Sequence, residues 1–290
     1  MITVFTPTFN RAYSLPNLYA SLCRQTCKDF EWLVVDDGST DNTTELFDAW
    51  IKETEFPIRY VKQENGGKHR AINHGARLAR GDLFFIVDSD DYLTDNAIEK
   101  ISGIYAGIAA NGSFAGLAGL KTIAPGNVSV STGWKEHDVD TTSIDIRYKY
   151  GIEGDLAEVF RTDILRQFPF PEIEKEKFCT EALVWNRIAK AGYKLRYTQV
   201  PIYICEYRAD GLTAASVNLR RRNPIATTLF YAELAHMPVP LLVKFKAQIN
   251  FWRFAGNSSF RRAKKLRMFY FLMLISWPFG SFMRFNDSRR

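Results

Sequence analysis

The sequence predicts an α/β fold with a mostly parallel, Rossmann-like sheet flanked by helices. Short apolar or β-branched runs at 2–6, 30–35, 58–61 and 83–87 alternate with stretches whose apolar residues follow helical spacing. Connections that hold a helix favour parallel neighbouring strands. The run Leu83–Val87 is apolar at every position, which is typical of a strand buried on both faces of a parallel sheet.

The first half of the chain has the clearer pattern. Its first turn, PTFNR, lacks a G-x-G-x-x-G motif, which argues against a dinucleotide-dependent dehydrogenase. The second strand ends in Asp36 and Asp37, and we interpret Asp36 as a structural acid that caps the Gly38-Ser39 turn. The expected helices begin at Ser14 and Asp41 and cover about 70–79 and 95–105.

The second half is less regular. Apolar residues at 156, 159, 160, 164 and 165 predict a helix over 156–168, and a second helix follows Phe178–Glu181. In the first half, His69 and His74 are interpreted as polar residues on a helix surface. The remaining expectations are strands at 117–123, 128–131 and 200–207, helices at 225–236 and 241–254, and a helix that starts at Ser258.

Three acids follow the buried run. Asp88 and Asp90 share the two-residue period of a strand, and Asp91 adjoins them. Open α/β sheets bind ligands beyond the carboxyl ends of their strands. Mg²⁺ or Mn²⁺ takes one or two carboxylates together with substrate phosphates. We therefore predict a metal site at Asp90, Asp88 and Asp91 that binds a nucleotide diphosphate.

The end of the chain differs in charge and composition. Residues 241–290 contain eleven Lys or Arg and one acid, whereas residues 1–240 have a net charge of −4. Residues 268–283 are almost wholly apolar, but about sixteen residues with Pro278 among them are too few to span a bilayer. We expect this segment to lie on the inner face of the cytoplasmic membrane. The alternative is a helical bundle on the catalytic domain, and a nucleic-acid partner is not expected.

The predicted organisation has one domain at 1–218, expected to be catalytic, and a helical, basic and aromatic extension at 219–290. The family resemblance described below implies that residues 1–106 form the nucleotide-binding half of this domain and residues 107–218 the acceptor-binding half. The four cysteines form no CxxC pair, and no signal-peptide pattern precedes Ile2. These features predict a cytoplasmic protein that is peripheral to the membrane.

Four motifs occur in the order and spacing of the family 2 glycosyltransferases. They are TPTFNR (6–11), VVDDGSTDNT (34–43), NGGKHRAINHG (65–75) and ARGDLFFIVDSDDYL (79–93). The chain resembles this family, and in particular its bacterial polysaccharide-assembly members. The resemblance implies the GT-A fold and an inverting transfer of a sugar from a nucleotide diphosphate sugar, with UDP as the expected nucleotide, to a saccharide hydroxyl.

The resemblance also implies roles for individual residues. Thr6 and Asp37 match positions that hold the base and ribose, with Pro7 and Asn10 beside them. Lys68 matches a segment near the base and diphosphate. Asp88 and Asp90 match the DxD pair, and Arg208 lies in a segment that closes over the diphosphate in the family.

The expected catalytic base is Glu181. In the family this helix start commonly has an acidic pair ending in Asp, but here Ala182 takes the second place. A family branch with Glu-x-Leu-Val-Trp-Asn-Arg-Ile at this point moves the role to Glu181, where a helix N-terminus favours negative charge. Asp155, Glu153 and Asp210 are the reserve candidates. The expected acceptor is a lipid-linked saccharide of a bacterial cell-surface polysaccharide pathway, and the alternative is a non-catalytic sugar-nucleotide-binding scaffold subunit.

Overall fold

The computed structural model describes residues 1–124, 128–135, 138–206, 216–255, 259–266, 268 and 270–287. The chain divides into two compact units, one of residues 1–169 and 191–208 and the other of residues 170–190 and 209–290. The domain boundary at residue 218 stays a prediction.

The first unit contains a mixed sheet of ten described strands in the order β3-β2-β1-β4-β9-β6-β10-β5, with β7 paired to β6 and β8 to β10. The strands are β1 (Ile2–Thr8), β2 (Phe30–Asp36), β3 (Ile58–Lys62), β4 (Leu83–Ile86), β5 (Tyr92–Leu93), β6 (Phe114–Ile123), β7 (Val128–Ser129), β8 (Asp138–Thr141), β9 (Leu156–Arg161) and β10 (Lys194–Cys205). Strands β1 to β4 pair in parallel, which confirms the predicted Rossmann-like half.

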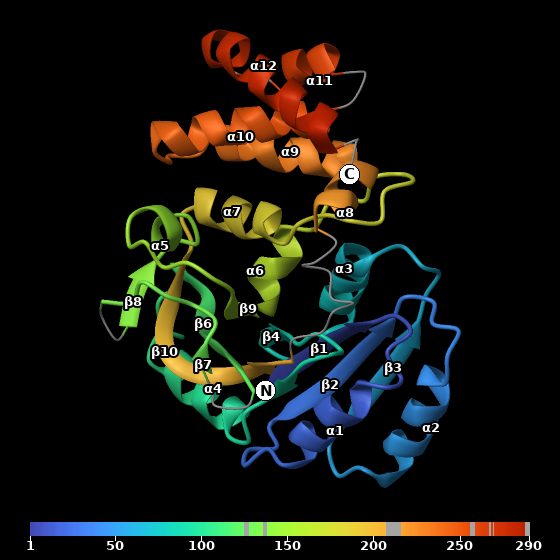
Figure 1. The fold of residues 1–290 in the computed structure, drawn as a ribbon. Helices are drawn as coiled ribbons and strands as arrows, with labels where there is room; N and C mark the ends of the chain where they lie inside the picture. Colours follow the sequence, from blue (N-terminus) through green and yellow to red (C-terminus); the bar gives the residue numbers. More distant parts are fainter. Residues whose placement is uncertain are drawn as a thin grey trace. The chain divides into compact units, whose positions relative to one another are not determined.

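The helices of this unit are α1 (Leu15–Cys23), α2 (Thr43–Glu53), α3 (Lys68–Leu78), α4 (Ala97–Ala106), α5 (Asp145–Tyr148) and α6 (Thr162–Gln167). Helices α1 and α2 cover one face of β1–β3, and α3 covers the other (Figure 1). The α1 and α2 face is packed with aromatic rings, among which Tyr19 stacks on Trp50 at 4.4 Å and Trp32 lies against Phe47. These rings pack α1 and α2 on the strands and so support the strand ends, where the candidate site lies.

Helix α3 approaches the sheet closely at a glycine. A Cβ placed on Gly75 would lie 2.0 Å from Cε2 of Phe5, whose ring stacks on Phe84 in the core. Because real contacts of this kind do not occur, a side chain here must displace either the helix or the ring. The position therefore fixes the distance between α3 and β1.

We expect Gly75→Ala to lower the free energy of unfolding by about 1–3 kcal/mol, the usual cost of overpacking a core. Urea denaturation measures this change. Gly103→Ala in α4 is the matched control, because a Cβ there meets nothing within 4 Å. That control should be neutral or stabilising by up to about 1 kcal/mol, since alanine is the better helix former. Equal effects of the two substitutions would contradict the close approach.

The helix predicted over 156–168 is wrong in its first half. Residues Leu156–Arg161 form strand β9, which lies between β4 and β6 and pairs antiparallel with both. Only Thr162–Gln167 is helical. Leu156, Ala157, Val159 and Phe160 are all buried, because a central strand is covered on both faces. That burial gives the same apolar spacing as a helix, so periodicity could not distinguish the two.

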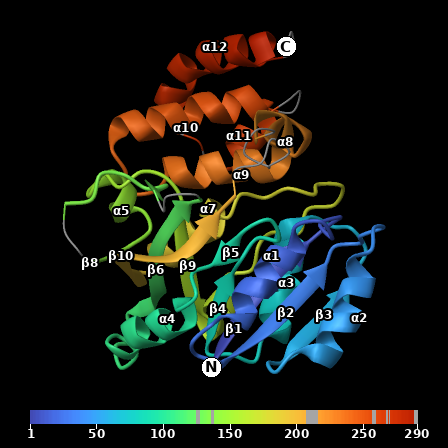
Figure 2. The same cartoon turned by 60° about the horizontal axis from the view of Figure 1, so that its bottom comes forward.

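The second unit is helical. Its helices are α7 (Ala182–Lys190), α8 (Ser216–Arg222), α9 (Pro224–Ala235), α10 (Leu241–Phe254), α11 (Ser259–Lys265) and α12 (Tyr270–Asp287). Helix α10 has the predicted bounds, whereas the single helix predicted from Ser258 is divided into α11 and α12. Helix α12 packs closely on α10, because a Cβ on Gly280 would lie 2.5 Å from the carbonyl oxygen of Ile249. Figure 2 shows α10 and α12 side by side.

One ion pair and a capping carboxylate join α7 and the segment before it to α9. The guanidinium of Arg187 in α7 binds the Glu233 carboxylate of α9 through two hydrogen bonds of 2.9 and 2.7 Å. The buried carboxylate of Glu176 accepts hydrogen bonds from the backbone N–H groups of Ile225 and Ala226, at 2.7 and 2.8 Å. These N–H groups open α9 and would otherwise have no helical acceptor. Helix α7 and the segment before it are thereby held against α9.

Candidate active site

The candidate site lies at the carboxyl edge of the parallel strands. The strand order reverses between β1 and β4, and such a switch point is where open α/β sheets bind ligands. The segments that leave β1, β2 and β4 carry Asn10, Asp37 and Asp88, respectively. The sequence motifs therefore converge on one edge of the sheet.

Asp37 organises the turn before α3. Its Oδ1 accepts hydrogen bonds from the Gly66 backbone N–H and from the Gln63 amide, both at 2.8 Å. Its Oδ2 accepts from the Gly67 N–H at 2.7 Å and from the Asn65 amide at 3.2 Å. In this structure the carboxylate thus shapes the Gly-Gly-Lys turn, and its predicted contact with the base or ribose stays a prediction.

Asp36 has the structural role predicted for it. Its Oδ1 accepts a hydrogen bond from the Ser39 backbone N–H at 2.8 Å, and its Oδ2 accepts one from the Tyr60 hydroxyl. Asp36 is fully buried. Burial and this hydrogen bond raise the pKa of Tyr60 above its ordinary value, so the phenol remains a donor.

Thr6, Pro7 and Asn10 belong to β1 and the turn that follows it. Thr6 is buried, and its hydroxyl accepts a hydrogen bond from the Trp32 indole at 3.0 Å. Asn10 has a left-handed backbone (φ 51°), and its amide oxygen accepts from the Thr40 backbone N–H at 2.8 Å. These contacts join the first two turns at the sheet edge.

Lys68, the first residue of α3, binds Asp88, which is the first acid of the turn at 88–91 (the DSDD turn). Its Nζ lies 2.5 Å from Oδ1 of Asp88, and both side chains are about 30% exposed. Burial alone would raise the pKa of Asp88, but the positive charges of Lys68, Lys121 and Arg11 outweigh it and lower that pKa. Asp37 and Asp88 are consequently connected through the same turn, one through Gly67 and the other through Lys68.

The pKa values of Asp90 and Asp91 shift upward, opposite to that of Asp88. Burial, followed by the negative charge of Asp88, raises the pKa of Asp90, and the same two causes raise the pKa of Asp91 to about 6. Oδ2 of Asp90 lies 3.9 Å from Nη2 of Arg11. Asp91 is held by protein, because Oδ2 accepts from the Tyr203 hydroxyl at 2.8 Å and Oδ1 accepts from the Glu206 N–H at 3.0 Å. Asp91 is therefore less available to a metal than Asp88 and Asp90.

The donor set is compatible with Mg²⁺ or Mn²⁺. Asp88 and Asp90 are oxygen donors that repel each other in a partly buried place, and a cation would relieve this repulsion. Among the described residues, no three His, Cys, Asp or Glu side chains come together as a metal-binding group. Two carboxylates and substrate phosphates are the usual magnesium ligands, so these residues fit the ion when a diphosphate is present.

Three residues near this cluster were not predicted from the sequence. Arg11 stands within the first motif, whereas Lys121 of β6 and Tyr203 of β10 are far from it in the chain. Burial alone would lower the pKa of Lys121, but the negative charge of Asp88 outweighs this effect and raises it. The Nζ of Lys121 lies 4.4 Å from the centroid of the Tyr203 ring. No local pattern signals Tyr203, which binds Asp91 across 112 residues.

Tyr203 of β10 binds the DSDD turn at two points. Its hydroxyl accepts a hydrogen bond from the Asp88 backbone N–H at 3.0 Å and donates to Asp91.

We expect Tyr203→Phe to lower the free energy of unfolding by about 1–3 kcal/mol, because two polar partners lose a buried hydrogen bond. Urea denaturation measures this loss, and titration with UDP and Mn²⁺ should show weaker binding. Tyr197→Phe, in the same strand and also buried, should leave nucleotide affinity unchanged; equal losses of affinity would exclude a positioning role.

The histidines of α3 differ from each other. His69 is buried, so its placement on the helix surface was wrong. Helix α3 is amphipathic, and this position turns toward the sheet. His74 is partly exposed and its Nδ1 lies 2.9 Å from the Gln63 amide oxygen. His74 thereby supports Gln63, which in turn binds Asp37.

Glu181 belongs to the second unit, and it lies directly before α7. Its carbonyl oxygen accepts a hydrogen bond from the Trp185 N–H at 3.1 Å, so it stands at the start of the helix, close to the predicted place. The role of Glu181 as the catalytic base stays a prediction. Arg208 and the reserve candidate Asp210 lie outside the described residues.

No helix of the described chain has the length and apolar character needed to cross a membrane. Helix α12 nevertheless presents large apolar side chains to solvent. Phe279 is 57% exposed and Phe282 is 65% exposed, and Trp277 and Phe285 are also exposed. The basic residues Lys264 and Lys265 of α11 are exposed as well.

Comparisons with known proteins find sequence similarity in the first part of the chain. Residues 3–106 match the family model described as glycosyl transferase family 2. Glycosyltransferase GlyG of Streptococcus pneumoniae is 38% identical over 102 residues, which are 35% of this chain and 34% of GlyG. The match thus spans about a third of that relative's length.

Solved structures share the fold over much more of the chain. Staphylococcus aureus TarS 1-349 in complex with UDP-GlcNAc has a TM-score of 0.66 and 19% identity, over 96% of this chain and 79% of that one. The mannosyltransferase PcManGT of Pyrobaculum calidifontis, in complex with GDP-Man and Mn²⁺, has a TM-score of 0.56 and 18% identity, over 99% of this chain and 87% of that one. The chain therefore has the GT-A fold, and its residues 3–106 match the family 2 glycosyltransferase model.

Proposed function

We propose that this protein is an inverting glycosyltransferase that moves a sugar from a nucleotide diphosphate sugar, UDP being the expected nucleotide, to a saccharide hydroxyl. The observation that carries the proposal is the cluster at the carboxyl edge of the sheet, where Lys68 binds Asp88 and Asp90 lies beside Arg11. Two carboxylates with adjacent cations suit a metal-bound diphosphate. The UDP-GlcNAc complex of TarS, which has the same fold, supports the choice of nucleotide.

The cluster residues have separable tasks in this proposal. Asp90, with Asp88 beside it, would hold Mg²⁺ or Mn²⁺, and a bound ion supplies positive charge that stabilises the leaving diphosphate. Lys68 and Arg11 balance the charge of the two acids and are placed to contact phosphate oxygens. The Asp37-bound turn positions Lys68 at the start of α3. Asp91 and Tyr203 stabilise the DSDD turn through their hydrogen bond.

Glu181 is the proposed general base. It accepts the proton of the acceptor hydroxyl while that oxygen attacks the anomeric carbon from the side opposite the diphosphate. The bond to the diphosphate breaks as the new glycosidic bond forms, so the configuration at the anomeric carbon inverts. Glu181 lies directly before α7, at the N-terminus of that helix.

The proposed acceptor is a lipid-linked saccharide in bacterial cell-surface polysaccharide biosynthesis. The exposed aromatic residues of α12 and the basic residues of α11 support a position at the inner face of the cytoplasmic membrane. The apolar residues would enter the headgroup region, while Lys and Arg would contact anionic lipids. An acceptor with a lipid anchor would be available at that surface.

The direct test is a panel of UDP- and GDP-sugars incubated with purified protein and Mn²⁺. Consumption of one nucleotide sugar, first by slow hydrolysis and then by transfer to a saccharide, is the expected result. The competing function is a non-catalytic sugar-nucleotide-binding scaffold, which Ala182 favours because the family commonly has an acid there. Nucleotide binding without turnover of any donor would support the scaffold.

A further inference from the structure

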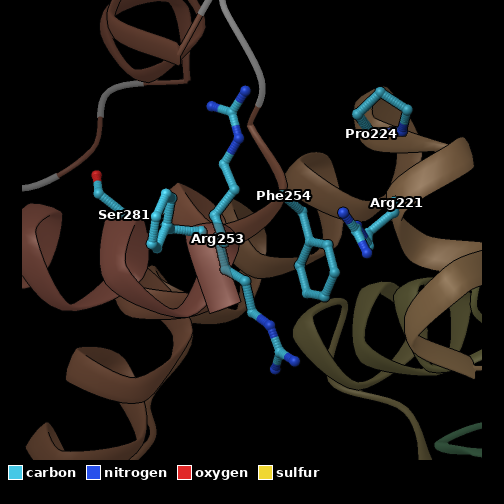
Figure 3. A pocket seen from close by; sticks show the side chains of 7 residues that line it. Arg221, Pro224, Arg253, Phe254 and Ser281 are labelled. Carbon is cyan, nitrogen blue, oxygen red and sulfur yellow. The ribbon is translucent and has the colours of Figure 1, made fainter. Parts of the chain in front are cut away.

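A cavity lies within the helical unit, away from the residues of the candidate active site. It has a volume of about 580 Å³ and lies among α8, α9, α10 and α12 (Figure 3). The residues that line it are chiefly Arg221, Arg253, Arg284, Phe254, Phe285 and Ser281. Cavities of this size are typical of sites for small molecules.

The lining is positively charged. Three of the lining residues are arginines, and none of the described lining residues is acidic. The nearby Asp287 forms two hydrogen bonds with Arg253, at 2.6 and 2.8 Å, and its carbonyl oxygen accepts one from Arg221. Even when Asp287 is counted, the formal charge around the cavity is +2. Planar guanidinium groups bind phosphate through paired hydrogen bonds, so the cavity suits a phosphate group.

The cavity is also continuous with apolar surface. Phe254 is buried in its wall, whereas Phe285 is 52% exposed and belongs to both the lining and the outer side of α12. Phe282, one turn before Phe285, is 65% exposed. A ligand with phosphate in the cavity could therefore extend an apolar chain over these two rings.

We propose that this cavity binds the phosphate group of a membrane lipid, with the lipid chain lying over Phe285 and Phe282. The inference deepens the proposed function, since it rests on a membrane position for the supply of ligand. It gives the basic extension a defined binding site in addition to general attraction to an anionic surface. Binding at this site requires no donor sugar and no transfer activity.

Calorimetric titration of the full chain with dodecyl phosphate below its micelle concentration tests the proposal. Inorganic phosphate and dodecyl maltoside separate the contributions of the phosphate and of the chain. We expect dodecyl phosphate to bind at least about tenfold more tightly than either, a difference of about 1.4 kcal/mol. Equal affinity for inorganic phosphate would mean a site for the free anion, and equal affinity for the maltoside would mean an apolar surface without phosphate recognition; either result overturns the lipid proposal.

Arg284→Gln should weaken binding of dodecyl phosphate about tenfold. Arg261→Gln is the matched control, because it removes the same charge from an exposed position of α11 that does not line the cavity. Arg221→Gln is the second variant if Arg284→Gln lowers the melting temperature. Unchanged affinity in both cavity variants, or an equal loss in the control, contradicts the site. These measurements can succeed or fail independently of sugar transfer.

Discussion

Asp90→Ala is expected to lower sugar transfer by about 10³-fold or more and to abolish metal-dependent UDP binding. Charge stabilisation by a metal ion contributes several kcal/mol, and about 4 kcal/mol corresponds to three powers of ten in rate. Asp90 lies beside Arg11, and its side chain is 23% exposed at the sheet edge. Transfer rates with the consumed donor, and UDP affinity with and without Mn²⁺, measure both effects.

The loss should not come from unfolding. Burial and the charge of Asp88 raise the pKa of Asp90, so its ionised form destabilises the fold at neutral pH. The melting temperature of Asp90→Ala should therefore equal or exceed that of the parent protein. Asp95→Asn, which replaces an exposed acid paired with Arg24, is the control and should transfer sugar within about twofold of the parent rate. Undiminished metal-dependent UDP affinity in Asp90→Ala would remove Asp90 from the metal site.

Glu181→Gln should abolish transfer while metal-dependent UDP binding remains. Loss of a general base typically lowers the rate about 10²–10⁴-fold. Glutamine keeps the size and most of the polarity of the side chain but cannot accept the acceptor's proton. Single-turnover transfer assays and UDP titrations distinguish this effect from a loss of donor binding.

Glu174→Gln provides the comparison within the same unit, because Glu174 is 90% exposed and precedes the helix that Glu181 begins. It should keep its full transfer rate. Persistent transfer by Glu181→Gln would move the base to another acid, with Asp155 and Glu153 as the next candidates. Parallel loss of UDP affinity would instead indicate that Glu181 supports the donor site.

The fold of the first half of the chain was predictable because its signals are local. Strands β1, β2 and β4 are short buried runs, and each leads directly into polar residues of the site, so the strand and its ligand turn are predicted together. The second half was less predictable, since β9 is buried on both faces and its apolar spacing imitates a helix. His69 was misplaced for a related reason, because burial of a polar residue depends on what α3 packs against.

The sequence by itself determined the strand-and-helix order of the first half, the acids at its strand ends and the basic, aromatic character of the last fifty residues. Those features depend on residues that are neighbours in the chain. Only the tertiary structure decided that Lys68 binds Asp88, that Lys121 and Tyr203 adjoin the DSDD turn, and that three arginines surround one cavity. These contacts join residues far apart in sequence, and their formation depends on how strands pair and helices pack.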